Sequence, residues 1–191
     1  MKMEVRIVGF GGQGIIRSGL ILSMAACIYG SKNAVQTQSY GPESRGGSCK
    51  SEVVVADTEI DFPLVDEPDV LVIMSQEAYH TYVNSVKKGA TILVDPEMAP
   101  ERADPPGSRI FDIPATKTAK EIGKTIVANV VMLGALVSLT EIVTHDEMKE
   151  AILHNIPKGT EELNLSAFEK GYSYGKTLLR KHAQKPQREH L

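Results

Sequence analysis

The sequence predicts an α/β protein with three layers, a mostly parallel β-sheet and a helical C-terminal third. Short strand-like apolar runs alternate with helical stretches along most of the 191 residues, which is typical of a sheet covered by helices. The run at residues 69–74 is almost continuously apolar, as expected for a central parallel strand that is covered on both faces. Near the N-terminus, a strand-like run passes through closely spaced glycines into a helical stretch, which indicates a Rossmann-like βα unit.

The expected strands are short apolar runs bounded by glycine, proline or charged residues, at 3–9, 34–38, 51–56, 69–74, 90–94 and 108–113. Helices are expected at 12–29 and at 76–86, where the helix ends near Gly89. A third helix begins at Pro114, because a proline loses nothing by lacking an N–H in the first turn. Residues 40–50 and 97–107 are rich in glycine and proline and are expected to be loops.

The last third is expected to be helical, at 125–143, 146–155 with Thr144 as its cap, and 163–181. The first of these helices is apolar almost all round, and Gly134 allows another element to approach it closely. Such a helix must be covered on every side, either by this chain or by a partner subunit, and periodicity does not separate the two. Since there is no internal repeat or long linker, we expect one domain over 1–191 with a flexible tail from about residue 181.

Composition gives little reason to expect nucleic acid or a membrane as a partner. The net charge is −3, so neither nucleic acid nor an anionic lipid surface would be attracted. The longest apolar run, 126–143, is interrupted by polar residues and would span a membrane poorly. The N-terminus shows no signal-peptide pattern, and we therefore expect a cytoplasmic protein.

The cysteines and histidines predict no metal site. Cys27 and Cys49 are the two cysteines, whereas an ordinary iron–sulfur cluster needs four thiolates. Cys27 lies in an apolar helical pattern and is expected in the core, and Cys49 lies in a polar glycine-rich segment and is expected to be accessible. The histidines have no metal-ligand spacing.

The most informative motif is the glycine turn G-F-G-G-Q-G at residues 9–14. A helix N-terminus after such a turn offers unpaired N–H groups and a partial positive charge to an anion. A dinucleotide site usually has an acidic residue about 20 residues further on, but residues 31–40 contain none and the next acid is Glu43. Gln13 also stands where a phosphate loop for ATP would have lysine. A nucleotide-type fold is therefore expected, and a working NAD site is disfavoured.

A second segment, residues 36–52, combines glycines with basic side chains. Arg45 and Lys50, together with Arg17 and the N–H groups of the glycine turn, could bind a phosphate or a carboxylate. Alternatively, Arg45 pairs with Glu43 or Glu52 and the glycines serve packing. No nucleophile elbow or catalytic triad can be identified, so we expect a binding or assembly unit without chemistry of its own.

Three motifs together resemble the gamma subunit of 2-oxoacid:ferredoxin oxidoreductases, over roughly residues 3–180. They are G-F-G-G-Q-G at 9–14, Q-T-Q-S-Y-G-P-E-S-R-G-G at 36–47 and K-S-E-V-V at 50–54. The second motif looks most like the 2-oxoglutarate branch, whereas pyruvate enzymes tend to F-G-P-E-R-R-G and indolepyruvate enzymes to S-Q-R-G-G. Gamma subunits for pyruvate or 2-ketoisovalerate remain alternatives.

The resemblance implies a multi-subunit enzyme that oxidatively decarboxylates a 2-oxoacid with coenzyme A (CoA) and reduces ferredoxin. It implies thiamine diphosphate and magnesium on alpha and beta subunits, iron–sulfur clusters on beta and delta, and no cofactor held by this chain alone. The gamma subunit would pack on alpha and contribute to the CoA side of the cleft. By itself, the chain could homodimerise through the surface meant for alpha.

The resemblance places the candidate site on the glycine turn and on the loop at residues 40–50. The candidate residues are Gly9, Gly11, Gly12, Gln13, Gly14, Arg45, Gly46 and Gly47. They would contact either the CoA phosphates or the alpha subunit, and the second option needs no ligand. We expect no catalytic or metal-binding residue. Two other classes stay open, an independent NAD-dependent oxidoreductase and a stand-alone nucleotide- or CoA-binding protein.

Overall fold

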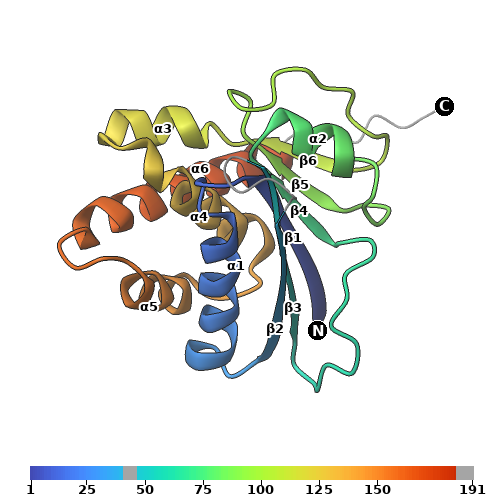
Figure 1. Ribbon diagram of the computed structural model, residues 1–191, viewed down its shortest axis with the longest axis horizontal. Helices are drawn as coiled ribbons and strands as arrows, with labels where there is room; N and C mark the ends of the chain where they lie inside the picture. The colour runs from blue at the N-terminus through green and yellow to red at the C-terminus, as the bar shows by residue number, and fades with distance from the viewer. Residues whose placement is uncertain (41–46, 184–191) are drawn as a thin grey trace.

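A computed structural model describes residues 1–40 and 47–183 and shows a six-stranded sheet in the order β2-β3-β1-β4-β5-β6 (Figure 1). The strands are β1 (Lys2–Phe10), β2 (Asn33–Tyr40), β3 (Ser48–Ala56), β4 (Val70–Ile73), β5 (Thr91–Val94) and β6 (Arg109–Asp112). Parallel pairing joins β1 to β4, β4 to β5 and β5 to β6, whereas β3 pairs antiparallel with both β1 and β2. The predicted α/β fold with a mostly parallel sheet is confirmed.

Helices lie on both faces of the sheet, with most of them on one face (Figure 1). They are α1 (Ile15–Met24), α2 (Gln76–Tyr82), α3 (Ala115–Ile122), α4 (Ala128–Thr140), α5 (His145–Asn155) and α6 (Glu161–Ala183). A π-helical turn, η1 (Ala25–Tyr29), extends α1, and a 3-10 turn, η2 (Thr125–Val127), precedes α4. Only α2 among the described helices lies on the other face, where its Tyr79 packs with Val8 and Ile73 in a smaller core.

Helix α4 is buried all round by other parts of the chain. Every residue from Ala128 to Leu139 is buried, so the described residues themselves supply the cover that the apolar pattern requires. The closest neighbour is α6, and the two backbones meet where side chains are absent. A Cβ on Gly134 would lie 2.2 Å from the Phe168 carbonyl oxygen, and one on Gly171 would lie 2.0 Å from the Val131 oxygen.

Several element ends differ from the sequence prediction for local reasons. Helix α1 begins at Ile15 rather than residue 12, because Gly12 and Gly14 have φ of 98° and 77° and lie in the left-handed region. Helix α4 ends at Thr140, where Glu141 takes φ 52°. The predicted Thr144 cap of α5 is confirmed, and Glu147 completes a capping box with it.

Both cysteine predictions were wrong. Cys27 is exposed, because it lies in η1, where Ala25 and Ala26 face the core and the next residues turn outward. Cys49 is only 5% exposed, since β3 is sandwiched between β1 and β2 and this side chain faces α1. Burial raises the pKa of the Cys49 thiol above its usual value.

No helix within residues 1–40 and 47–183 combines the length and apolarity needed to cross a bilayer.

Candidate functional site

The glycine turn lies at the carboxyl end of β1 and leads directly into α1. Its Gly11 N–H donates to the Gly47 carbonyl at 3.0 Å, which ties the turn to the segment before β3. Gly14 is crowded from within, since a Cβ there would lie 2.5 Å from Asn129 Nδ2. Gly12 is different, because a Cβ there would meet nothing within 4 Å. The outward side of the turn is therefore open to a ligand or a partner.

The Gln13 side chain spans the point where β1 and β4 separate. Its Oε1 accepts the Phe10 N–H at 2.9 Å, and its Nε2 donates to the Met74 carbonyl at 2.6 Å. From these two strands the chain leaves to opposite faces, toward α1 and α2 (Figure 1). Open α/β sheets bind ligands at such a switch point. Here Gln13 joins the two strand ends and holds the glycine turn in shape.

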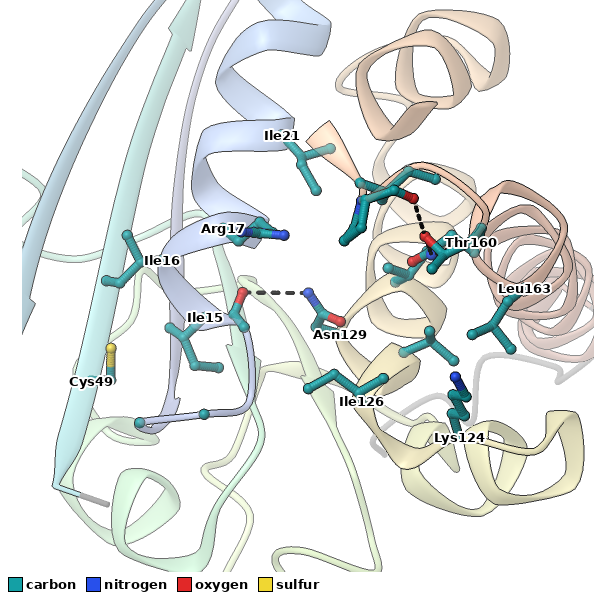
Figure 2. A pocket seen from close by; sticks show the side chains of 18 of the residues that line it. Ile15, Ile16, Arg17, Ile21, Cys49, Lys124, Ile126, Asn129, Thr160 and Leu163 are labelled. Carbon is teal, nitrogen blue, oxygen red and sulfur yellow. Dashed lines mark hydrogen bonds between the residues drawn. The ribbon is translucent and has the colours of Figure 1, made fainter. Parts of the chain in front are cut away.

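A groove of about 520 Å³ lies beside the turn (Figure 2). Its walls come from the start of α1, the start of α4 and the region where α5 is joined to α6. Most lining residues are apolar, among them Ile15, Ile16, Ile21, Ile126, Val130, Ile156 and Leu163. Small-molecule sites typically measure roughly 300–1,000 Å³ and are mostly apolar with a few polar groups. The groove has the size and character of such a site.

Two buried asparagines supply amide groups to the groove. Asn129 is 5% exposed, and its Nδ2 donates to the Gly14 carbonyl at 3.4 Å and to Ser18 Oγ at 3.2 Å. Figure 2 shows the bond from Asn129, on α4, to the carbonyl oxygen at the start of α1. Asn164 is 7% exposed, and its Nδ2 donates to the Thr160 carbonyl at 2.9 Å. Asn129 thus fixes α4 relative to α1, whereas Asn164 bonds only within the start of α6.

The charged groups of the groove are all cationic among the lining residues that the structure describes. Arg17 and Lys124 line it, and no aspartate or glutamate does. Arg17 is exposed, and its Nη1 donates to the Asn155 carbonyl at 3.4 Å. The N-terminus of α1 adds a partial positive charge, with no acidic residue in its first turn. The groove therefore favours an anionic ligand or a negatively charged surface.

The structure brings most of the candidate residues together. Gly9, Gly11, Gly12, Gln13, Gly14 and Gly47 all lie in or against the turn. Arg45 and Gly46 lie outside the described residues.

Lys50, also a candidate anion contact, is engaged on the sheet. Its Nζ lies 3.1 Å from Glu52 Oε2, and Arg6 Nε lies 2.7 Å from Glu52 Oε1. Glu52, which the sequence offered as a partner for Arg45, is thus held by Arg6 and Lys50.

Sequence reasoning missed the far wall of the groove. Lys124, Asn129, Thr160 and Asn164 come from segments more than a hundred residues after the glycine turn. Asn129 alone could have been noticed in the sequence, because an amide inside an apolar helix must find hydrogen-bond partners in another element.

Within the described residues, His, Cys, Asp and Glu side chains form no group of three or more that could hold a metal ion.

Comparisons with known proteins agree on one family. The family model described as pyruvate ferredoxin/flavodoxin oxidoreductase matches residues 4–174. A 2-oxoglutarate synthase subunit KorC from Methanocaldococcus jannaschii is 53% identical over 180 residues, covering 93% of this chain and 96% of the relative.

Two solved structures are also similar. The gamma subunit of a keto/oxoacid ferredoxin oxidoreductase from Geobacter sulfurreducens matches with TM-score 0.83 and 40% identity, over 92% of this chain and 97% of that one. A 2-oxoglutarate:ferredoxin oxidoreductase from Magnetococcus marinus, with 2-oxoglutarate, CoA and succinyl-CoA bound, matches with TM-score 0.84 and 27% identity. That match covers 92% of this chain but only 31% of the longer Magnetococcus chain.

Proposed function

This chain belongs to the pyruvate ferredoxin/flavodoxin oxidoreductase family, and we propose that it is the gamma subunit of a 2-oxoglutarate:ferredoxin oxidoreductase. The observation that carries the proposal is the 53% identity to a 2-oxoglutarate synthase subunit over nearly the full length of both chains. The form of the motif at residues 36–47 favours the same substrate branch. The enzyme would convert 2-oxoglutarate and CoA to succinyl-CoA and carbon dioxide, and pass the electrons to ferredoxin.

In this proposal the chain works as one gamma-type domain inside a larger assembly in the cytoplasm. Its partners are alpha, beta and delta subunits, with ferredoxin as the electron acceptor of the complex. Thiamine diphosphate, magnesium and the iron–sulfur clusters belong to those partners. The oxidation and decarboxylation chemistry is then theirs, and this chain contributes binding surface and shape.

The glycine turn is the part of this chain that we assign to CoA. The open side of Gly12, the N-terminus of α1 and the absence of carboxylates from the described groove lining all suit a phosphate-bearing ligand. Gln13 would not contact CoA itself but would keep the turn in shape, since its side chain forms hydrogen bonds to the backbone of Phe10 and Met74. Packing of the turn against alpha, without any ligand, is the competing explanation.

Purification of the tagged chain from its host organism under native conditions tests the assembly. We expect stoichiometric co-elution of chains that carry thiamine-binding and ferredoxin-type cysteine motifs. Recovery of the chain alone, under conditions that preserve other multi-subunit enzymes of the host, would instead favour a stand-alone nucleotide- or CoA-binding protein.

A further inference from the structure

The segment between β3 and β4 exposes two large apolar side chains at the end of the sheet opposite the glycine turn (Figure 1). Phe62 is 64% exposed and Leu64 is 57% exposed, and Pro63 stands between them. We refer to residues 57–67 as the acidic loop. Exposed apolar side chains rimmed by polar residues are a common feature of surfaces that bind another protein.

The acidic loop is held from behind by a buried arginine. Arg6 is 5% exposed, and its Nη2 donates to the Val65 carbonyl at 2.7 Å and to the Asp66 carbonyl at 3.0 Å. Its Nε meets Glu52 at 2.7 Å, so the charge is balanced within the sheet. Val65 is itself only 6% exposed. The loop therefore presents Phe62 and Leu64 from a fixed base.

The charge of the loop limits the kinds of surface that it can meet. It carries exposed carboxylates and no lysine or arginine, the carboxylates being those of Asp57, Glu59, Asp61, Asp66 and Glu67. The amino group of Met1 pairs with Asp57, which leaves the others toward solvent. Like charges would repel the same loop of a second copy, nucleic acid and an anionic membrane. A polypeptide surface with basic groups around an apolar pocket is complementary.

We propose that the acidic loop docks this chain onto the alpha subunit of its oxidoreductase, with Phe62 and Leu64 in an apolar pocket rimmed by lysine and arginine. This inference rests on the proposed function. In the Magnetococcus relative, the matched region is 31% of a longer chain, so there the corresponding fold is covalently joined to further polypeptide. Where the corresponding fold makes up nearly the whole chain, as in the Geobacter gamma subunit, a non-covalent contact has to take its place. Docking at this end leaves the glycine turn free at the other end of the sheet (Figure 1).

The test measures how tightly the whole purified chain binds the other subunits of the oxidoreductase, which are purified together from the host organism. Replacing Phe62 and Leu64 together by serine should weaken binding by about tenfold or more, because central apolar anchors contribute most to an interface. The matched control replaces Leu20 and Ile28, which are 43% and 61% exposed on α1 and η1, by serine and should change affinity less than about twofold.

A second pair of variants tests the charge. The double change Glu59→Gln and Asp61→Asn should weaken binding at low salt and flatten its salt dependence, since surface charge attraction is screened by ions. These substitutions preserve side-chain size on an exposed loop, so the fold is not challenged.

The outcomes separate the two proposals. If the native chain does not bind the other subunits at all, the proposed function fails. If it binds and both loop variants bind equally well, the docking inference is overturned and the proposed function stands. Self-association of the chain that the serine variant abolishes would also overturn it, in favour of a second copy as the occupant.

Discussion

At the scale of single residues, Gln13 explains how a glycine-rich turn keeps one shape. Its amide satisfies the Phe10 N–H and the Met74 carbonyl, which otherwise have to find partners at a partly buried strand end. We expect Gln13→Ala to lower the free energy of unfolding by about 1–3 kcal/mol, measured by urea denaturation. Gln38, exposed on β2, gives a control, and its change to alanine should cost less than about 0.5 kcal/mol. Equal losses for the two variants would show that the Gln13 bridge has no special role.

Arg45 is the residue whose substitution separates CoA binding from packing. Losing a charged contact to phosphate costs about 1.5–3 kcal/mol, so Arg45→Ala in the assembled enzyme should raise KM for CoA by about tenfold or more. Neither kcat at saturating CoA nor assembly should change. Arg180→Ala, at an exposed position on α6, serves as the control and should leave KM unchanged. An unaltered KM for the Arg45 variant would leave contact with the alpha subunit as the role of residues 40–50.

Residue types alone predicted the glycine turn but not the surroundings of each glycine. The G-x-G-x-x-G spacing indicates a tight turn, yet only packing shows that Gly14 is crowded by Asn129 while Gly12 is open. The cysteines illustrate the same limit. Their local composition suggested the reverse of their real exposure, because a π-helical turn carries Cys27 outward, whereas Cys49 lies on an inner strand and faces α1.

At the scale of elements, the close contact of α4 and α6 depends on glycine. Gly171 packs against the Val131 carbonyl, and a Cβ there would lie 2.0 Å from that oxygen. Gly171→Ala should therefore push the helices apart and lower the free energy of unfolding by about 1–3 kcal/mol or more. Ser173→Ala, at an exposed position of α6, should be nearly neutral. Calorimetry on both variants checks this, and an equally stable Gly171 variant would mean that the helices can separate without loss.

His145 makes the contact between α5 and α6 dependent on pH. Burial lowers its pKa, but hydrogen bonds and charges of Asp146 and Glu169, at 3.0 and 2.9 Å, outweigh burial, and the net pKa is raised above 6.5. The side chain also packs on Phe168 and Tyr172, and Lys176 lies over the Tyr172 ring.

A raised pKa in the folded state means that protonated His145 stabilises the protein. This contribution is fully present below the unfolded pKa, near 6.5, and is lost as pH rises through the higher folded value. Unfolding curves of the native chain and of His145→Gln should therefore differ more at pH 6 than at pH 9. A difference that stays constant over this range would show that the ion pairs contribute nothing.

Periodicity predicted the existence of the elements better than their partners. Strands and helices are found close to the expected positions, because each has a clear apolar pattern and local end signals. The antiparallel direction of β3 was not predicted, since alternation does not reveal strand direction. Nor could periodicity show what covers α4, which the structure answers with α6 and the other described elements around it.

At the scale of the whole molecule, the candidate site combines a sequence motif, the glycine turn, with a groove wall that has no motif of its own. The glycine turn was predictable because its residue types are required by its geometry. The opposite wall comes from α4 and the start of α6, where ordinary apolar residues carry no local signal of a groove. Only the tertiary fold brings Asn129 against Gly14 and places Leu163 on the same groove. The exposed side chains of the acidic loop were missed for the same reason, since the residue types of Phe62 and Leu64 do not reveal their exposure.

The most direct measurement is CoA-dependent dye reduction by the assembled enzyme, with and without this chain, on 2-oxoglutarate, pyruvate and 2-oxoisovalerate. We expect kcat/KM for 2-oxoglutarate to exceed the other two by at least about tenfold, which corresponds to 1.4 kcal/mol of discrimination. Omission of this chain should abolish the CoA-dependent activity. A preference for pyruvate or 2-oxoisovalerate, or full activity without the chain, would contradict its identification as the gamma subunit of a 2-oxoglutarate enzyme.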